Sequence, residues 1–155
     1  MNYYYYTDMA ATPAGLVKKK FDNWDTKTKG SFLADCADHG LKFFEKLYPE
    51  DLRPRKAIEA IRLYAAGKIT VEQLKAAADA ACNAADSAAI IKVDSSIKAA
   101  IHAALAASHA AYATAIVCES AKYADWSLNH AIWATKDEAS EKLYQHELFL
   151  DYIDL

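Results

Sequence analysis

Residues 99–118 read AAIHAALAASHAAYATAIVC, a run of twenty residues without a charged side chain. Ten of them are alanine, and residues 76–115 hold 19 of the 33 alanines in the chain. Alanine is the best helix former because it loses no side-chain entropy in a helix. The run is long enough to span a bilayer, but it has few bulky apolar side chains and contains two histidines. We therefore expect a central helix that other helices of a bundle cover.

The remaining composition points to one domain of the all-α class. A chain of 155 residues can bury roughly 68–70% of its unfolded surface, so it can fold without a disulfide or a metal. Every glycine and proline lies between Pro13 and Gly67, and the four glycines are too scattered to form a phosphate loop or a dinucleotide fingerprint. This excludes P-loop enzymes and Rossmann dehydrogenases. With 18 basic and 21 acidic side chains, the chain lacks the basic stripe of a nucleic-acid-binding protein.

Apolar spacing and helix start and stop signals predict a single compact bundle of five to six helices over residues 31–155, after an irregular N-terminal arm over residues 1–30. Thr70 and Gln73 match a capping box, and Gly67 is a suitable left-handed end for the helix before it. The expected helices are Ser31–Leu47, Pro54 to Gly67, Thr70 to about Ala89, Asp94 or Ser95 to about Lys122, Trp126–Ala134, and a last one opened by a second capping box, Thr135-Lys136-Asp137-Glu138.

The cysteines indicate reduced thiols rather than a disulfide framework. Cys36, Cys82 and Cys118 are odd in number and widely spaced, and the N-terminus has no secretory signal pattern, so we expect a cytoplasmic protein. Cys36 falls on the apolar face of its predicted helix, and the other two lie in alanine-rich helices, where a thiol packs like a hydrophobe. No serine stands in a nucleophile elbow. We therefore expect no catalytic residues, no cofactor and no enzymatic activity.

Two histidines of the central run form a possible polar site. His102 and His109 are seven residues apart and so share one helix face. None of the five histidines has a glutamate three residues before it, which is the spacing that di-metal bundles use. We expect no metal centre, although a helical ligand- or metal-binding protein, or an enzyme using these two histidines, stays an alternative.

The three arginines of the chain lie within one short stretch. They are Arg53, Arg55 and Arg62 of the segment DLRPRKAIEAIR, residues 51–62. Because lysine serves elsewhere, these positions suit the planar, multi-donor guanidinium group. Two roles compete: an internal lock in which the arginines bond acidic side chains or helix carbonyls, and a site for an anionic ligand. The candidate residues for either role are Asp51, Arg53, Arg55, Glu59 and Arg62.

The same stretch resembles a known family. The residues that carry the likeness are Asp35-Cys36-Ala37, Phe43-Phe44-Glu45, the run from Tyr48 to Ala60 with its Asp-x-Arg-Pro-Arg block, and Gly67-Lys68-Ile69-Thr70-Val71. This pattern resembles the putative immunity protein family of bacteria, the immunity-protein-five-like domain, over about residues 31–134. The resemblance implies an all-helical cytoplasmic protein that neutralises a bacterial toxin by binding it.

The C-terminal residues carry an acidic excess. Residues 137–155 contain six acidic side chains against one lysine, Lys142. A binder of a basic toxin could present such a surface, or an aromatic one with Tyr144, Phe149 and Tyr152, because opposite fields speed encounter. A solvated helix face is the alternative role of the charges. We expect a protein toxin as partner, with no nucleic acid and no membrane, and a homodimer if the Tyr3–Tyr6 arm packs onto a second copy.

Overall fold

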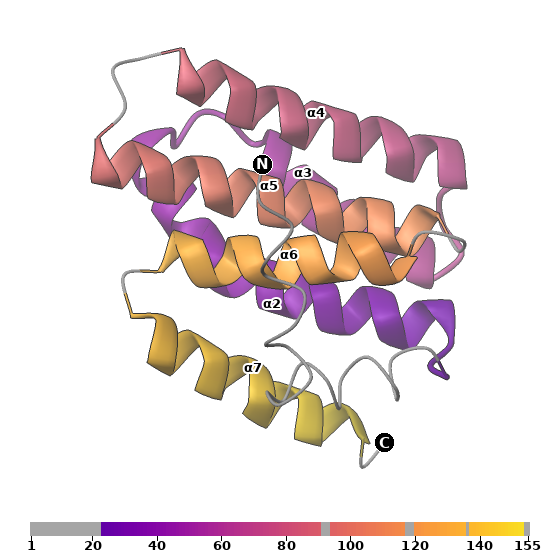
Figure 1. Ribbon diagram of the computed structural model, residues 1–155. Coiled ribbons are helices and arrows are strands. Elements are labelled where there is room, and N and C mark those ends of the chain that lie inside the picture. The colour runs from indigo at the N-terminus through magenta and orange to yellow at the C-terminus, as the bar shows by residue number, and fades with distance from the viewer. Residues whose placement is uncertain (1–22, 91–93, 117–119, 136, 154–155) are drawn as a thin grey trace.

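The fold is a bundle of helices without strands over the residues that the structure describes. The computed structural model describes residues 23–90, 94–116, 120–135 and 137–153. Its helices are α2 (Thr26–Leu47), α3 (Arg53–Ala65), α4 (Val71–Ala89), α5 (Ser95–Ala115), α6 (Ser120–Ala134) and α7 (Glu138–Ile153) (Figure 1). The predicted all-α class and the predicted compact helix packing are confirmed. The Tyr3–Tyr6 arm lies outside the described residues.

Helix α5 is the centre of the bundle. It packs against α2, α3, α4 and α6, whereas α7 lies at the edge and contacts α2 and α6 (Figure 1). Eleven residues of α5 are buried, nine of them alanine, so the neighbouring helices approach it closely. Two buried hydroxyl groups find carbonyl acceptors across these contacts: Ser108 Oγ donates to Ala78 O at 2.9 Å, and Ser127 Oγ donates to Ala106 O at 2.9 Å.

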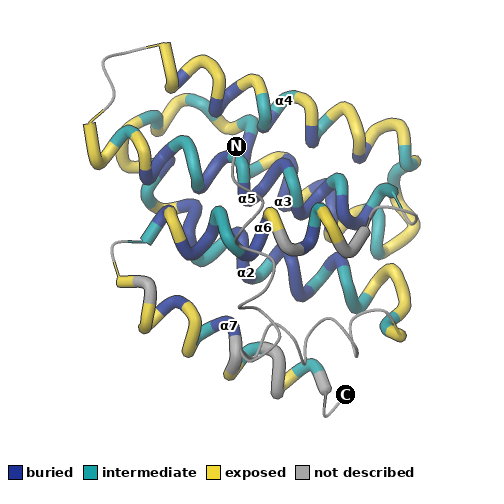
Figure 2. The backbone as a smooth tube through the Cα atoms, viewed as in Figure 1, coloured by how far each residue is buried: buried dark blue, intermediate teal, exposed yellow. Residues whose placement is uncertain are grey.

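The ends of α3 and α4 follow the sequence signals. Gly67 has φ +69°, and the bonds Gly67 N to Tyr64 O and Lys68 N to Leu63 O form the paired pattern of a Schellman end. Thr70 then opens α4 with both bonds of a capping box to Gln73. On α4 the exposed residues face away from α5 (Figure 2). The predicted capping box and left-handed end are confirmed.

The prediction that the first helix begins at Ser31 is wrong. Helix α2 begins at Thr26, where Asp25 Oδ1 accepts a bond from Thr28 N at 2.7 Å. Gly30 therefore lies inside a helix. A Cβ atom there would lie 3.0 Å from Thr114 Cγ2 and 3.1 Å from Ile61 Cγ2, so the glycine allows α2 to approach α5 and α3.

The predicted boundary between the fourth and fifth helices is also wrong. Helix α5 ends at Ala115 rather than near Lys122, and α6 begins at Ser120 rather than Trp126. Ile116 leaves the helix with φ −116° and ψ 93°. Thr114, Ile116 and Val117 are β-branched, and such residues lose side-chain freedom in a helix.

The last helix is capped by Asp137 and not, as the sequence predicted, by Thr135. Asp137 Oδ1 accepts a bond from Ser140 N at 3.1 Å, whereas Thr135 Oγ1 donates to the carbonyl oxygens of Ile132 and Asp137. Because the Thr135 hydroxyl serves the end of α6, it caps no amide of α7.

None of the described helices combines the length and the apolar character that a bilayer crossing requires.

Candidate functional site

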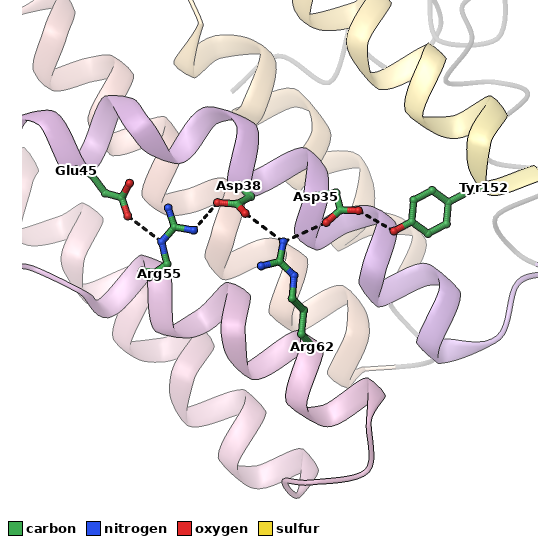
Figure 3. Close-up of polar contacts among 6 residues, drawn as sticks. All are labelled: Asp35, Asp38, Glu45, Arg55, Arg62 and Tyr152. Carbon is green, nitrogen blue, oxygen red and sulfur yellow. Dashed lines mark hydrogen bonds and ion pairs between the residues drawn. The ribbon is translucent and has the colours of Figure 1, made fainter.

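Two of the three arginines connect α3 to α2. Arg55 donates from Nε to Glu45 Oε1 at 2.8 Å and from Nη1 to Asp38 Oδ1 at 2.5 Å. Arg62 donates from Nη2 to Asp35 Oδ1 and to Asp38 Oδ2, both at 3.1 Å. Tyr152 of α7 extends the chain of contacts, since its hydroxyl donates to Asp35 Oδ2 at 2.7 Å. Figure 3 shows the resulting α2–α3 ion network, which comprises Glu45, Arg55, Asp38, Arg62, Asp35 and Tyr152.

The network holds its charges by mutual pairing. Hydrogen bonds with Glu45 and then with Asp38 raise the pKa of Arg55 further above its ordinary value. Burial, together with the bond to Asp35, raises the pKa of the Tyr152 hydroxyl, so this group stays a donor. Every guanidinium group of the network thus faces carboxylates of its own chain. We interpret the network as a lock between α2 and α3 that α7 closes at one end.

Arg53 and Glu59 take no part in this network. Arg53 pairs with Asp51 two residues earlier, through Nε to Oδ1 at 2.9 Å and Nη2 to Oδ2 at 2.7 Å. Asp51 Oδ1 also accepts from Arg53 N at 3.2 Å, at the first turn of α3. Glu59 is exposed on α3 and forms no ion pair with any residue that the structure describes. The five candidates of the arginine segment therefore do not converge on one site.

A shallow, open pocket lies between α2 and α7 beside the network. Its volume is about 260 Å³, and its lining residues are Asp35, Asp38, His39, Tyr144 and Leu148. The His39 and Tyr144 rings stack with centroids 4.0 Å apart and planes at 20°. Burial raises the pKa of Tyr144 to about 12, so its hydroxyl is neutral at pH 7. We call this feature the α2–α7 pocket.

A buried carboxylate lies next to the pocket. Glu141 of α7 is 1% exposed, and its Oε2 lies 2.6 Å from His39 Nδ1. Its Oε1 accepts from Gln145 Nε2 at 3.0 Å, and the same nitrogen lies 3.3 Å from Leu128 O. The expectation that all acidic residues of the C-terminal segment form a surface is thus wrong for Glu141. It faces inward because partners on α2 and α7 satisfy both of its oxygens.

The tyrosines predicted for a C-terminal binding surface also pack against α2. Tyr152 contacts the rings of Trp24 and Phe32 at centroid distances of 6.0 and 5.7 Å, and Tyr144 stacks on His39. The side chain of Phe149 lies outside the described residues. The exposed acidic groups that α7 does present include Glu147 and Asp151.

A second candidate region joins α5 to α6. His102 Nδ1 and His130 Nδ1 lie 3.0 Å apart, so one of these nitrogens donates to the other. The His109 ring also stacks on the His130 ring, with the two centroids 5.0 Å apart. The centroid of the His109 ring lies 5.2 Å from that of Trp126. Further ring contacts extend the row to seven side chains, which we call the ring strip: Tyr112, Tyr123, Trp126, His109, His130, Trp133 and His102.

The histidines of the ring strip are neutral at pH 7. Burial lowers the pKa of His109 to about 4, and burial together with the neighbouring histidines lowers that of His130 to about 3. Burial, then Lys98, also lowers the pKa of His102. His109 Nδ1 is buried and has no hydrogen-bond partner among the described residues. Among the described residues, no carboxylate forms an ion pair with these three rings, and no group of three or more His, Cys, Asp or Glu is placed to hold a metal.

Sequence reasoning identified two members of the ring strip and missed the partner between them. His102, Leu105, His109 and Tyr112 follow spacings of three, four and three residues along α5. Tyr123, Trp126, His130 and Trp133 repeat the same spacings along α6. This second pattern marks one helix face, but a helix expected to begin at Trp126 leaves out Tyr123 and so shortens the pattern.

The cysteines offer no activated nucleophile in the described residues. Burial raises the pKa of Cys36 well above its ordinary value, and the negative charges of Glu141 and Asp35 act in the same direction. Burial also raises the pKa of Cys82. Both thiols are therefore protonated at pH 7, and a thiol attacks poorly in that form. Cys118 lies outside the described residues.

Comparison with known proteins identifies the family. The family model described as Imm-5 like putative immunity protein matches residues 20–148. The match spans α2 to α6 and most of α7, including both candidate regions. No curated protein and no solved structure matches the chain. The resemblance indicated by the Asp-x-Arg-Pro-Arg block is thereby confirmed.

Proposed function

The chain belongs to the Imm-5 like putative immunity protein family, and from this we propose that it is a non-enzymatic protein that binds a cognate toxin and neutralises it. The family match over residues 20–148 is the observation that carries the proposal. We further propose that the protein acts in the cytoplasm, where the toxin would meet its target.

The chemistry of the two candidate regions favours binding over catalysis. The arginines of the α2–α3 ion network already bond carboxylates of the same chain. The three stacked histidines have lowered pKa values and face aromatic rings. A general base needs a pKa near the working pH and a partner that orients it. An imidazole with a pKa of about 3 or 4 is a weak base. A rigid, stoichiometric binder needs neither.

The surface of the bundle also suits a protein partner. Trp126 and Trp133 of the ring strip are 37% and 51% exposed. Tryptophan is enriched among the residues that dominate binding energy in interfaces. The net charge of −3 favours encounter with a basic partner through long-range attraction. These features support a protein toxin as the partner and do not specify the activity of that toxin.

The test combines capture with a titration of protection. The full chain is used to capture proteins from the organism that encodes it, and each stoichiometric partner is expressed with and without the chain. We expect one partner to arrest growth alone and to be harmless when the chain is co-expressed. In vitro, protection should reach its end point at one chain per toxin. Protection at a small fraction of one equivalent would contradict the non-enzymatic proposal, and a partner that is harmless alone would contradict neutralisation.

A further inference from the structure

The α2–α7 pocket combines carboxylates with ring and aliphatic surface. Asp35 and Asp38 supply the charged wall from α2, Tyr144 and Leu148 supply the other wall from α7, and His39 completes the lining. At about 260 Å³ the pocket is smaller than the sites of about 300–1,000 Å³ that hold drug-sized ligands. A single long side chain is a better match to its size than a metabolite.

The α2–α3 ion network, taken together with the neighbouring Glu141 and His39, carries a net negative charge. Asp35, Asp38, Glu45 and Glu141 contribute four carboxylates, whereas Arg55 and Arg62 contribute two positive charges. The sum is −2 with a neutral His39 and −1 with a protonated one. The pocket therefore attracts a cation in either state of the histidine.

The two lining carboxylates keep acceptor capacity. Asp35 accepts one bond from Arg62 and one from Tyr152, and Asp38 accepts one from Arg55 and one from Arg62. An ionised carboxylate offers about four lone-pair positions. Each group can thus accept a further donor without losing the bonds of the α2–α3 ion network.

The apolar lining selects among cations. Leu148 can cover the aliphatic stem of a long basic side chain, and Tyr144 adds aromatic surface to the lining. Arginine also presents five donors in a planar fork, which can address more than one carboxylate oxygen, whereas the lysine ammonium is a compact point charge. The charged groups beside the ring strip include the cations Lys98 and Lys122, so it does not favour a basic side chain in this way.

We propose that the α2–α7 pocket receives one arginine side chain projecting from the toxin, with the guanidinium group against Asp35 and Asp38 and its stem along Leu148. This inference rests on the proposed function, because the arginine belongs to the protein that the chain neutralises. The partner is therefore expected to expose an arginine on its contact surface. The pocket then acts as the anchor point of the complex.

The first arm of the test probes the pocket without a toxin. The full chain is titrated with N-acetyl-arginine amide, with the neutral isostere N-acetyl-citrulline amide, and with N-acetyl-lysine amide, while amide shifts are followed by NMR. We expect saturable shifts at residues 35–39 and 144–148 with the arginine probe, and at least about tenfold weaker binding of the citrulline probe, since charge-assisted bonds are lost. Equal binding of citrulline, or shifts that avoid the pocket, overturns the proposal, and equal binding of lysine overturns the choice of arginine.

The second arm uses the captured toxin and two matched variants. Asp35→Asn keeps an acceptor for the Tyr152 hydroxyl and removes one charge from the pocket, whereas Asp151→Asn removes one charge from an exposed position of α7 that does not line it. We expect the dissociation constant to rise at least about tenfold for Asp35→Asn and to stay within about twofold for Asp151→Asn. If Asp35→Asn does not fold, Tyr144→Leu takes its place.

The two proposals fail in different ways. A toxin that binds both variants with the affinity of the natural chain overturns the pocket inference and leaves the proposed function intact. A chain that protects against no toxin overturns the proposed function, and with it the anchoring role, whatever the arginine probe shows. A toxin whose contact surface carries no arginine overturns the inference as well.

Discussion

The α2–α3 ion network and the ring strip join neighbouring helices by opposite means. In the network, two arginines and three carboxylates alternate at distances of 2.5–3.1 Å. In the ring strip, three histidines stack among tyrosines and tryptophans at centroid distances of 5.0–6.0 Å. Both regions are partly exposed, and both use side chains spaced three, four or seven residues apart, which places them on one face of each helix.

The difference lies in whether an opposite charge lies beside each partly buried ionisable group. In the network each charge faces an opposite charge, so hydrogen bonds from carboxylates raise the pKa of Arg55. In the ring strip the nearest groups are other imidazoles and aromatic rings, so burial lowers the pKa values of His109 and His130. Pairing with carboxylates therefore keeps the charged form in the network, whereas burial without an opposite charge favours the neutral form in the ring strip. The two regions should respond differently to acid, to mutation and to salt.

Mild acid should give the largest effect, and it should act through the ring strip. Unfolded histidine has a pKa of about 6.5, whereas the folded values of His109 and His130 are about 4 and 3. Below pH 6.5 the unfolded state therefore binds more protons than the folded state, so the free energy of unfolding falls as the pH falls. Because both rings keep partial contact with water, we expect a loss of about 2 kcal/mol between pH 7 and pH 4.5, measured by urea denaturation.

The variant His130→Phe isolates this contribution. It keeps a ring between His102 and His109 but removes the nitrogens that titrate. We expect its unfolding free energy to depend less on pH between 6.5 and 4.5 than that of the natural chain. A pH dependence of equal slope in both proteins would show that the ring strip is not its source.

Removal of Arg55 should give the next largest effect, in the ion network. Arg55→Ala takes away the cation between Asp38 and Glu45, which are seven residues apart on one face of α2. Hydrogen bonds to charged groups contribute about 1.5–3 kcal/mol when buried, and exposed ion pairs about 0–1 kcal/mol. Since Arg55 is 30% exposed, we expect a loss of about 1–2 kcal/mol at pH 7 in thermal or urea unfolding.

Arg55→Lys is the matched control for geometry. It keeps the positive charge, but an ammonium group cannot reproduce the planar fork that meets Asp38 and Glu45 through separate nitrogens. We expect the free energy of unfolding of Arg55→Lys to lie between that of the natural chain and that of Arg55→Ala. If the lysine variant matches the natural chain, charge alone suffices and the interpretation of a geometric lock is wrong.

The parts of the fold that could be predicted depend on neighbours in sequence. The Thr70–Gln73 capping box and the left-handed Gly67 are local signals, and the structure forms both. The alanine-rich central helix also follows from local composition. The Asp51–Arg53 pair lies within one turn, so the sequence could suggest it as well. Such features need no knowledge of which helices meet.

The parts that could not be predicted depend on contacts between distant helices. Gly30 resembles a helix stop until α5 and α3 are placed against it. Glu141 resembles a surface acid, but His39 lies 102 positions away in sequence and pairs with it inside the bundle. His130 likewise joins His102 only when α6 packs antiparallel to α5. A spacing pattern on one helix identifies a face, and packing alone decides what that face meets.

Removal of Arg53 should give the smallest effect, because its ion pair is local to the start of α3 and its contact with α4 is one exposed bond of 3.4 Å to Ser87 Oγ. Arg53 and Asp51 are 38% and 24% exposed, and Asp51 also accepts a bond from Arg53 N. Arg53→Ala keeps that backbone bond, so we expect a loss below about 0.5 kcal/mol, whereas Asp51→Ala should cost about 0.5–1 kcal/mol.

Acid and salt separate this local pair from the ion network. The side-chain bond from Arg53 is the main cause that lowers the pKa of Asp51, so its stabilising contribution holds above pH 4 and disappears as the pH falls through the lowered value. NMR titration should show the Asp51 pKa rising toward its ordinary value in Arg53→Ala. High salt should erase the small Arg53 effect, because exposed charges are screened, while much of the Arg55 effect survives. Equal salt sensitivity of the two variants would mean that the network is no more than a set of surface pairs.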